Sequence, residues 1–401
     1  MTKSPTNIRI ALCALFGVLL LIGLVFYGAS QNMSAKNAPH DPVVADALDQ
    51  ARALQKQGAL LEAFTIFERH ALQGFPEAMF HTAKAYIKGW GVDSDLDKAR
   101  HYLLLAVEYG FSYRGETAYE IGRLFQRSHG VDCNSIAVEW FKKSLEWHYD
   151  KAALQLAIHY EKGLGVEPEI ENAVFYYQRA IETGNEQAHI KFARLLMEGK
   201  YGLTANPKQA RKLVDFAVVQ LNRKAVSGSP TAAKQLGRLF RDGKLVNRDL
   251  ERAEKWLRRG AYLGSEGGMH DLARLLLMDI SRAEKQEEAI SWLRRAAEKG
   301  HGGAMTSLGR YHLEEKYGLQ KAGAVRWFEL GVAANHGGSM EELARLYAAG
   351  VLVRKDPVEA LRLAKIGSRI GHSGSKKLLL ELQSEMAEKA QLSQLTAKRQ
   401  E

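Results

Sequence analysis

The chain has 401 residues, 46% of them hydrophobic, and its formal net charge at pH 7 is +10. Only two cysteines occur, Cys13 and Cys133, which excludes a disulfide framework and a cysteine-based metal site. The positive charge allows an anionic partner, but 46 acidic residues are mixed among 56 basic ones, and a solvated basic surface explains the same numbers. No basic run typical of a nucleic-acid site occurs, so we expect no nucleic-acid partner.

The first 30 residues predict a transmembrane helix. The apolar segment covers residues 8–29, and residues 10–29 carry no charge, which at about 1.5 Å per residue is long enough to span a bilayer core. Lys3 and Arg9 precede this run, so the amino terminus is expected in the cytoplasm and the remaining chain on the far side. Cleavage as a signal peptide near residues 28–30 is the alternative.

Two short segments lead from this anchor to the main part of the chain. Residues 31–43 are polar and predict a linker. Residues 44–75 predict a divergent capping pair of helices, at 45–57 and 60–72. At the other end, residues 373–401 predict a charged capping helix over 376–397 with a frayed tail.

Residues 76–372 repeat one two-helix pattern eight times. The first helix of each copy carries a small residue that recurs every 35 to 44 positions, followed three residues later by a large one. The small residues are Ala83, Gly122, Ala157, Ala193, Gly237, Ala273, Gly309 and Ala344. A glycine turn follows in several copies, as in 89–91 and 163–165, because the residue after a helix often needs positive φ.

The second helix of each copy has its own spacing. An alanine is followed by a bulky residue at the third position and a small residue at the seventh, and four of the six tryptophans are that bulky residue: Trp140, Trp256, Trp292 and Trp327. Small residues let two helices approach closely, and the bulky residues are expected to fill the space beside them. One pair cannot bury its apolar face alone, so the pairs are expected to stack into an all-α solenoid, a superhelix with a concave side.

The pattern Ala-x-x-x-Leu-Gly-x-x-Tyr-x-x-Gly-x-Gly-Val, followed by Lys-Ala-x-x-Trp and Ala-Ala-x-x-Gly, resembles that of Sel-1-like repeats, which are related to tetratricopeptide repeats. The resemblance implies a right-handed α-solenoid that binds proteins, has no catalytic activity and needs no cofactor. Bacterial members imply a scaffold or adaptor of the cell envelope, in the assembly or regulation of a secretion or exopolysaccharide complex. The same resemblance implies that this protein lies in the inner membrane, with its repeats in the periplasm.

The candidate partner-binding residues directly follow the small residue of the first helix. Seven of these eight positions are basic: Lys84, Arg123, Arg194, Arg238, Arg274, Arg310 and Arg345. Stacked repeats would place them in a column about 10 Å apart, suited to an acidic partner. The alternative function is therefore a carrier or guide that binds an anionic polymer such as an acidic polysaccharide. Alternatively, the arginines pair with acids of their own helix or of the next one, and Glu120–Arg123, Asp271–Arg274 and Glu342–Arg345 have the spacing for pairs within one helix.

Other features predict little chemistry. His301, His336 and His372 each follow a second helix, where they are either turn residues or a pH-sensing column, and their spacing is too wide for a shared metal. No phosphate-binding loop, metalloprotease motif or nucleophile elbow occurs, so we expect no catalytic, cofactor-binding or metal-binding residues. An insertion at 219–229 and altered turns near 278–281 and 314–318 either shape a partner site or reflect drift.

Overall fold

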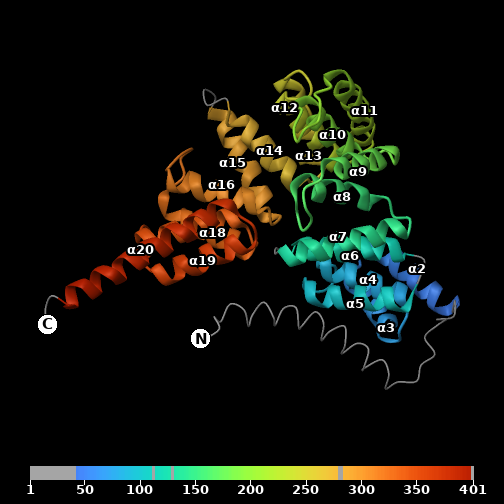
Figure 1. Cartoon of the computed structure of the whole chain (residues 1–401), viewed down its shortest axis with the longest axis horizontal. Coiled ribbons are helices and arrows are strands. Elements are labelled where there is room, and N and C mark those ends of the chain that lie inside the picture. Colours follow the sequence, from blue (N-terminus) through green and yellow to red (C-terminus); the bar gives the residue numbers. More distant parts are fainter. Residues whose placement is uncertain (1–41, 111–112, 128–130, 279–282, 399–401) are drawn as a thin grey trace. The chain divides into compact units, whose positions relative to one another are not determined.

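The computed structural model describes residues 42–110, 113–127, 131–278 and 283–398, which form helices and no strands, as predicted (Figure 1). The described residues fall into two compact units, up to Thr117 and from Ala118. Consecutive helices pack on one another from α2 to α5 and from α7 to α20. Residues 1–30, with the predicted transmembrane helix, and most of the predicted linker lie outside the described residues. Among the residues that are described, no helix is long and apolar enough to cross a membrane.

The first unit begins with a helix pair that precedes the repeats. Its helices are α2 (Pro42–Gln57), α3 (Leu60–Leu72), α4 (Pro76–Lys88) and α5 (Leu96–Tyr109), followed by the start of α6 (Arg114–Arg127). Helix α3 has the predicted bounds, but α2 begins at Pro42 and not at residue 45. Proline is well suited to the first turn of a helix, where its missing N–H has no partner to lose. Leu48, Phe67 and Met79 are buried in the core of this unit.

The second unit continues the repeats from α7 onward. Its helices are α7 (Val131–Glu146), α8 (Lys151–Lys162), α9 (Ile170–Glu182), α10 (Glu186–Glu198), α11 (Pro207–Val226), α12 (Pro230–Asp242), α13 (Leu250–Tyr262), α14 (Glu266–Leu276), α15 (Ala283–Glu298), α16 (Gly302–Leu313), η1 (Lys321–Gly323), α17 (Ala324–Ala333), α18 (Gly337–Ala349), α19 (Pro357–Arg369) and α20 (Ser373–Lys398). Even-numbered helices from α8 to α18 are first helices of a repeat, and the odd-numbered ones are second helices. Helix α20 packs on α18 and α19 through Leu378 and Leu382.

The core of each repeat is centred one residue later than the sequence predicts. The residue four positions after the alanine of the second helix is buried in all eight copies: Leu103, Phe141, Tyr177, Val214, Leu257, Leu293, Phe328 and Ala364. Of the tryptophans at the third position, Trp292 is buried, whereas Trp140, Trp256 and Trp327 are half-buried. At 100° per residue, positions 0, 4 and 7 lie within one narrow face and position 3 lies at its edge.

This core residue explains why the first helix needs a small residue opposite it. A Cβ added to Gly122 would lie 2.7 Å from the ring of Phe141, and one added to Gly237 would lie 2.5 Å from the side chain of Leu257. Glycine at these positions therefore allows close packing between the two helices of a repeat.

The insertion near 219–229 is helical and largely continues α11, which has 20 residues. Leu221 and Ala225 in the added turns are buried. Arg259 of the next repeat donates to the carbonyl oxygens of Ala225 and Val226 at 2.8 and 2.7 Å, and so satisfies acceptors at the carboxyl end of α11. The insertion is thus part of the packed array.

Candidate functional site

Two adjoining hollows in the second unit form the candidate site. They share the lining residues His270, Arg274, Gly303 and His336, and lie along the first helices of three successive repeats, α14, α16 and α18, with Arg238 contributed by α12. We call this surface the α14–α16 groove, and its charged and histidine lining is Arg238, Glu266, His270, Asp271, Arg274, Lys299, His301, Arg310, Glu314, Lys316, His336 and His372.

Two of the predicted arginines in the groove form ion pairs with the following repeat. Arg238 pairs with Asp271, whose side chain is only 3% exposed and also accepts from Arg241 at 3.2 Å. Arg310 pairs with Glu342 of α18 at 2.6 Å. These two arginines thus follow the alternative of structural pairing, because stacking brings an acid of the next repeat close to each guanidinium.

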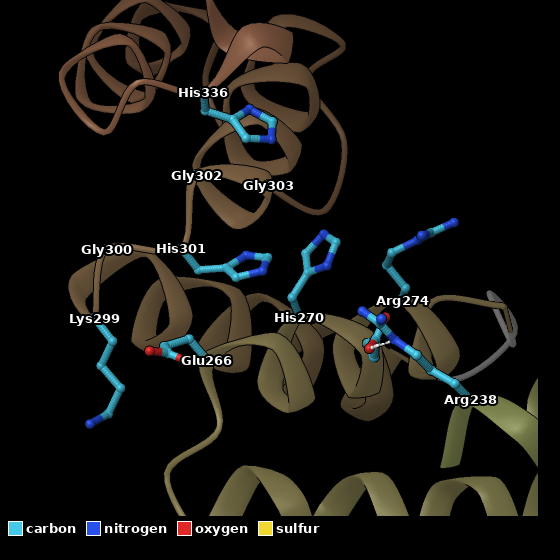
Figure 2. A pocket seen from close by; sticks show the side chains of 11 residues that line it. Arg238, Glu266, His270, Arg274, Lys299, Gly300, His301, Gly302, Gly303 and His336 are labelled. Carbon is cyan, nitrogen blue, oxygen red and sulfur yellow. Dashed lines mark hydrogen bonds and ion pairs between the residues drawn. The ribbon is translucent and has the colours of Figure 1, made fainter. Parts of the chain in front are cut away.

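Arg274 differs from its two neighbours in the groove. It is exposed and makes no hydrogen bond or ion pair with any residue that the structure describes, including Asp271 three residues back. In Figure 2 its side chain extends away from that of Arg238. Among the described residues, the groove therefore contains one arginine without a partner between two that have one.

The other four predicted residues do not line the groove. Lys84, in the first unit, pairs with Glu116 at 3.3 Å. Arg123 donates to the hydroxyl of Tyr119 at 3.1 Å and lies over its ring, and Arg345 pairs with Glu341 at 2.8 Å. Arg194 is exposed and has no hydrogen bond or ion pair within the described part of the chain. The structure thus brings three of the seven predicted residues together.

The recurring histidines begin first helices. His301 Nδ1 accepts from the backbone N–H of Ala304 at 3.0 Å, and His372 Nδ1 accepts from that of Ser375 at 3.1 Å, so both imidazoles act as helix caps. His336 stands at the same place before α18, and its Nδ1 lies 2.9 Å from the hydroxyl of Thr306. Both are turn residues whose side chains satisfy N–H groups at the start of the following helix.

His270 is a groove residue that the sequence did not indicate. Its ring centre lies 4.8 Å from that of His301, and Figure 2 shows the two imidazoles side by side. No other copy has a histidine at this position of the first helix, so the repeat pattern carries no signal for it. Proximity to the recurring histidines became visible only in the folded chain.

Burial sets the charge of the groove histidines. Desolvation lowers the pKa of His270 to about 4, with a further decrease from His301 and from the cations Arg274 and Arg238, against an opposing effect of Asp271. Desolvation also lowers the pKa of His301 and of His336. These imidazoles are therefore neutral at pH 7, and the positive charge of the groove comes from its arginines and lysines.

This arrangement is suited to binding an anion. An unpaired guanidinium offers several N–H donors in one plane, which matches a carboxylate. Among the described residues, no group of three histidine, cysteine, aspartate or glutamate side chains is placed to hold a metal ion.

Comparisons with known proteins place this groove within a repeat array. The model of the Sel1 repeat matches residues 76–110, 116–146, 150–185, 187–215, 230–265, 268–301 and 338–372. It matches seven segments, whereas the sequence pattern indicates eight copies. The unmatched copy spans 302–337, where α16 and α17 nevertheless form a helix pair.

Chitin synthase regulatory factor 3 of Schizosaccharomyces pombe is 25% identical over 204 residues, which are 50% of this chain and 21% of that protein. The chain thus spans about a fifth of the length of the curated relative it matches. A protective antigen of uropathogenic Escherichia coli with an SLR fold is 23% identical, with 87% of this chain and 76% of that one covered and a TM-score of 0.40. A Sel1 repeat protein from Oxalobacter formigenes is also 23% identical, with 63% and 96% covered and a TM-score of 0.43.

The matches to the repeat model together cover more than half of the chain. The chain therefore belongs to the Sel1 repeat family, whose repeats mediate interactions between proteins.

Proposed function

We propose that this protein is a non-catalytic scaffold, anchored in a membrane by its N-terminal segment, that binds a protein partner in the α14–α16 groove. The observation that carries the proposal is Arg274, a guanidinium without a partner among the described residues, which lines a hollow formed by successive repeats. A charged donor group left exposed in a concave surface is available to a ligand.

The arginines that flank Arg274 support the same role. The side chains of Arg238 and Arg310 are 46% and 49% exposed despite their ion pairs, so a partner can contact them as well. Three basic side chains on three successive first helices then face one ligand. A repeat array suits this task because each added repeat extends the binding surface.

The membrane part of the proposal rests on the sequence alone. The uncharged run at 10–29, preceded by Lys3 and Arg9, favours a single span with the amino terminus in the cytoplasm and the repeats in the periplasm of a bacterial inner membrane. Extraction of membranes with alkaline carbonate and protease treatment of spheroplasts test it. Release of the chain by carbonate, or full protection of the repeats from added protease, would contradict this topology.

The scaffold role is tested by crosslinking in intact cells and mass spectrometry of the captured proteins. The test variant carries Arg238→Glu, Arg274→Glu and Arg310→Glu. The control carries the same change of charge at the exposed residues Lys208, Arg211 and Lys212 of α11, outside the groove. We expect the wild type and the control to capture the same protein and the groove variant to lose it. Equal capture by all three would refute the groove as the binding surface.

The name of the yeast relative, a regulatory factor of chitin synthase, favours regulation of an enzyme complex as the task of such a scaffold. An exopolysaccharide or secretion complex of the cell envelope remains the kind of assembly that we propose. If the wild type captures no protein and instead binds an acidic polysaccharide in a salt-sensitive manner, the alternative of a polymer carrier replaces the scaffold.

A further inference from the structure

The two ion pairs of the groove join equivalent positions of neighbouring repeats. Arg238 on α12 pairs with Asp271 on α14, and Arg310 on α16 pairs with Glu342 on α18. Each arginine directly follows the small residue of its helix, and each acid stands two residues before the small residue of the following first helix. The same two positions of the repeat therefore meet at both junctions.

The junction between α14 and α16, which lies between these two, lacks the pair. The residue two positions before Gly309 is Ser307, where the neighbouring first helices have Asp271 and Glu342. The hydroxyl of Ser307 donates to the carbonyl oxygen of Gly303 at 2.9 Å and lies 3.3 Å from Nε2 of His270. Serine is shorter than either acid and carries no charge, so Arg274 has no counterpart on α16.

At this junction, the position where the adjacent junctions have an acid lies beside a hollow. His270, Arg274, Gly303, Ser307 and Tyr311 all line the same hollow. The nearby Lys316 already pairs with Glu314 at 2.5 Å, and Arg310 pairs with Glu342, so Arg274 is the cation lining this hollow that has no partner among the described residues. A ligand that supplies one negative charge there would complete the series of pairs.

We propose that the groove binds a carboxylate of an acidic side chain of the protein partner on Arg274, in the place that Asp271 and Glu342 occupy at the adjacent junctions. The two neighbouring junctions show that this position of the arginine accepts a carboxylate. Guanidinium and carboxylate match in shape and charge. This inference rests on the proposed function, since it names the chemistry by which the scaffold recognises its partner.

Ser307→Asp tests the inference, because it would supply the missing carboxylate from α16 and leave Arg274 in place. Ser307→Asn is the matched control, with the same size and no charge. The probe is a fluorescent peptide of about ten residues that alternates glutamate and glycine, and its binding is measured by anisotropy at low salt. We expect the wild type and Ser307→Asn to bind alike, and Ser307→Asp to bind about tenfold more weakly or worse.

Arg274→Gln gives a second measurement that does not depend on the folding of Ser307→Asp, and the same loss is expected. Binding by Ser307→Asp and Arg274→Gln at the strength of the wild type would overturn the inference. In that case the capture of a protein by the wild type, but not by the triple charge-reversal variant, would still uphold the scaffold role. Polygalacturonate is a parallel probe. If it binds and the peptide does not, the carboxylate source is a polysaccharide, and the inference of an acidic protein side chain is overturned.

Discussion

His336, at the start of α18, packs against Gly302, the first residue of α16 in the preceding repeat. A Cβ built on Gly302 would lie 2.5 Å from the Cβ of His336, closer than real side chains approach. Gly337 and His372 make the same contact one repeat later. At these two junctions, the histidine that begins one first helix thus packs against the glycine that begins the previous one.

Gly302→Ala should destabilise the protein by about 1–3 kcal/mol, because the added methyl group overpacks the junction. Thermal or urea-induced unfolding of the second unit measures the effect. His336→Gly removes the side chain that the methyl group would meet, so the double variant should be less destabilised than the sum of the two single variants. A purely additive result would show that the two residues do not restrict each other.

The helix pairs could be predicted from the sequence, whereas the contacts between the helices could be predicted only in part. Small residues recur at one position of the first helix, so the pairing of helices within the repeats follows from spacing. The buried position of the second helix is filled by residues of different shape, such as Tyr177, Leu257 and Phe328, whereas the recurrent tryptophans draw attention to the edge of the face. A periodic pattern locates a helix face more reliably than its centre.

Gly165, the second glycine of the turn after α8, should tolerate substitution less than other glycines of similar backbone conformation. Gly165 has φ +72, and a Cβ there would overlap the backbone of Asn134 and Ser135 in the preceding repeat. Gly184 has φ +74 and nothing within 4 Å of its Cβ position. In both alanine variants the positive φ should lower the free energy of unfolding by about 1–2 kcal/mol. Gly165→Ala should lower it further, because only there does the new Cβ overlap other atoms. Equal unfolding temperatures for the two would contradict the contact.

The two arginine partners of the buried Asp271 carboxylate should contribute unequally to the stability of the protein. Arg241 is 18% exposed and Arg238 is 46% exposed, so water replaces the lost bond of Asp271 more readily at Arg238. Arg241→Gln should cost about 1.5–3 kcal/mol, the range for hydrogen bonds to charged groups, and Arg238→Gln less. Removing both should cost more than either alone, because the charge is then buried without a partner.

Urea unfolding of the three variants checks this order. Asp271→Asn in the double-variant background should recover part of the loss, because it removes the unpaired charge. If Arg238→Gln proved the more damaging single change, the exposed fraction would not govern the strength of these bonds.

Only those site residues that occupy a repeated position could be predicted from the sequence. Arg238, Arg274 and Arg310 share one position of the repeat, and that position was found from spacing. Their acids come from the following repeat, and which faces of two helices meet there depends on how the pairs stack. His270 has no counterpart in other copies, and the gap at Ser307 becomes visible only beside Asp271 and Glu342. Such exceptions to the repeat carry the function that we propose.

Acid should destabilise the second unit through its buried histidines. The pKa of His270 is about 4 in the folded chain and near its ordinary value of 6.5 when unfolded. Between these values the unfolded chain binds more protons, so stability is at its full value above pH 6.5 and decreases as the pH falls toward 4. His270→Gln should reduce this dependence of the unfolding temperature on pH. His81 in the first unit, with its pKa also lowered to about 4 by burial, should contribute in the same direction. A pH profile of His270→Gln that matches the wild type would mean that His270 gains protons equally in both states, and hence that it is not desolvated in the groove.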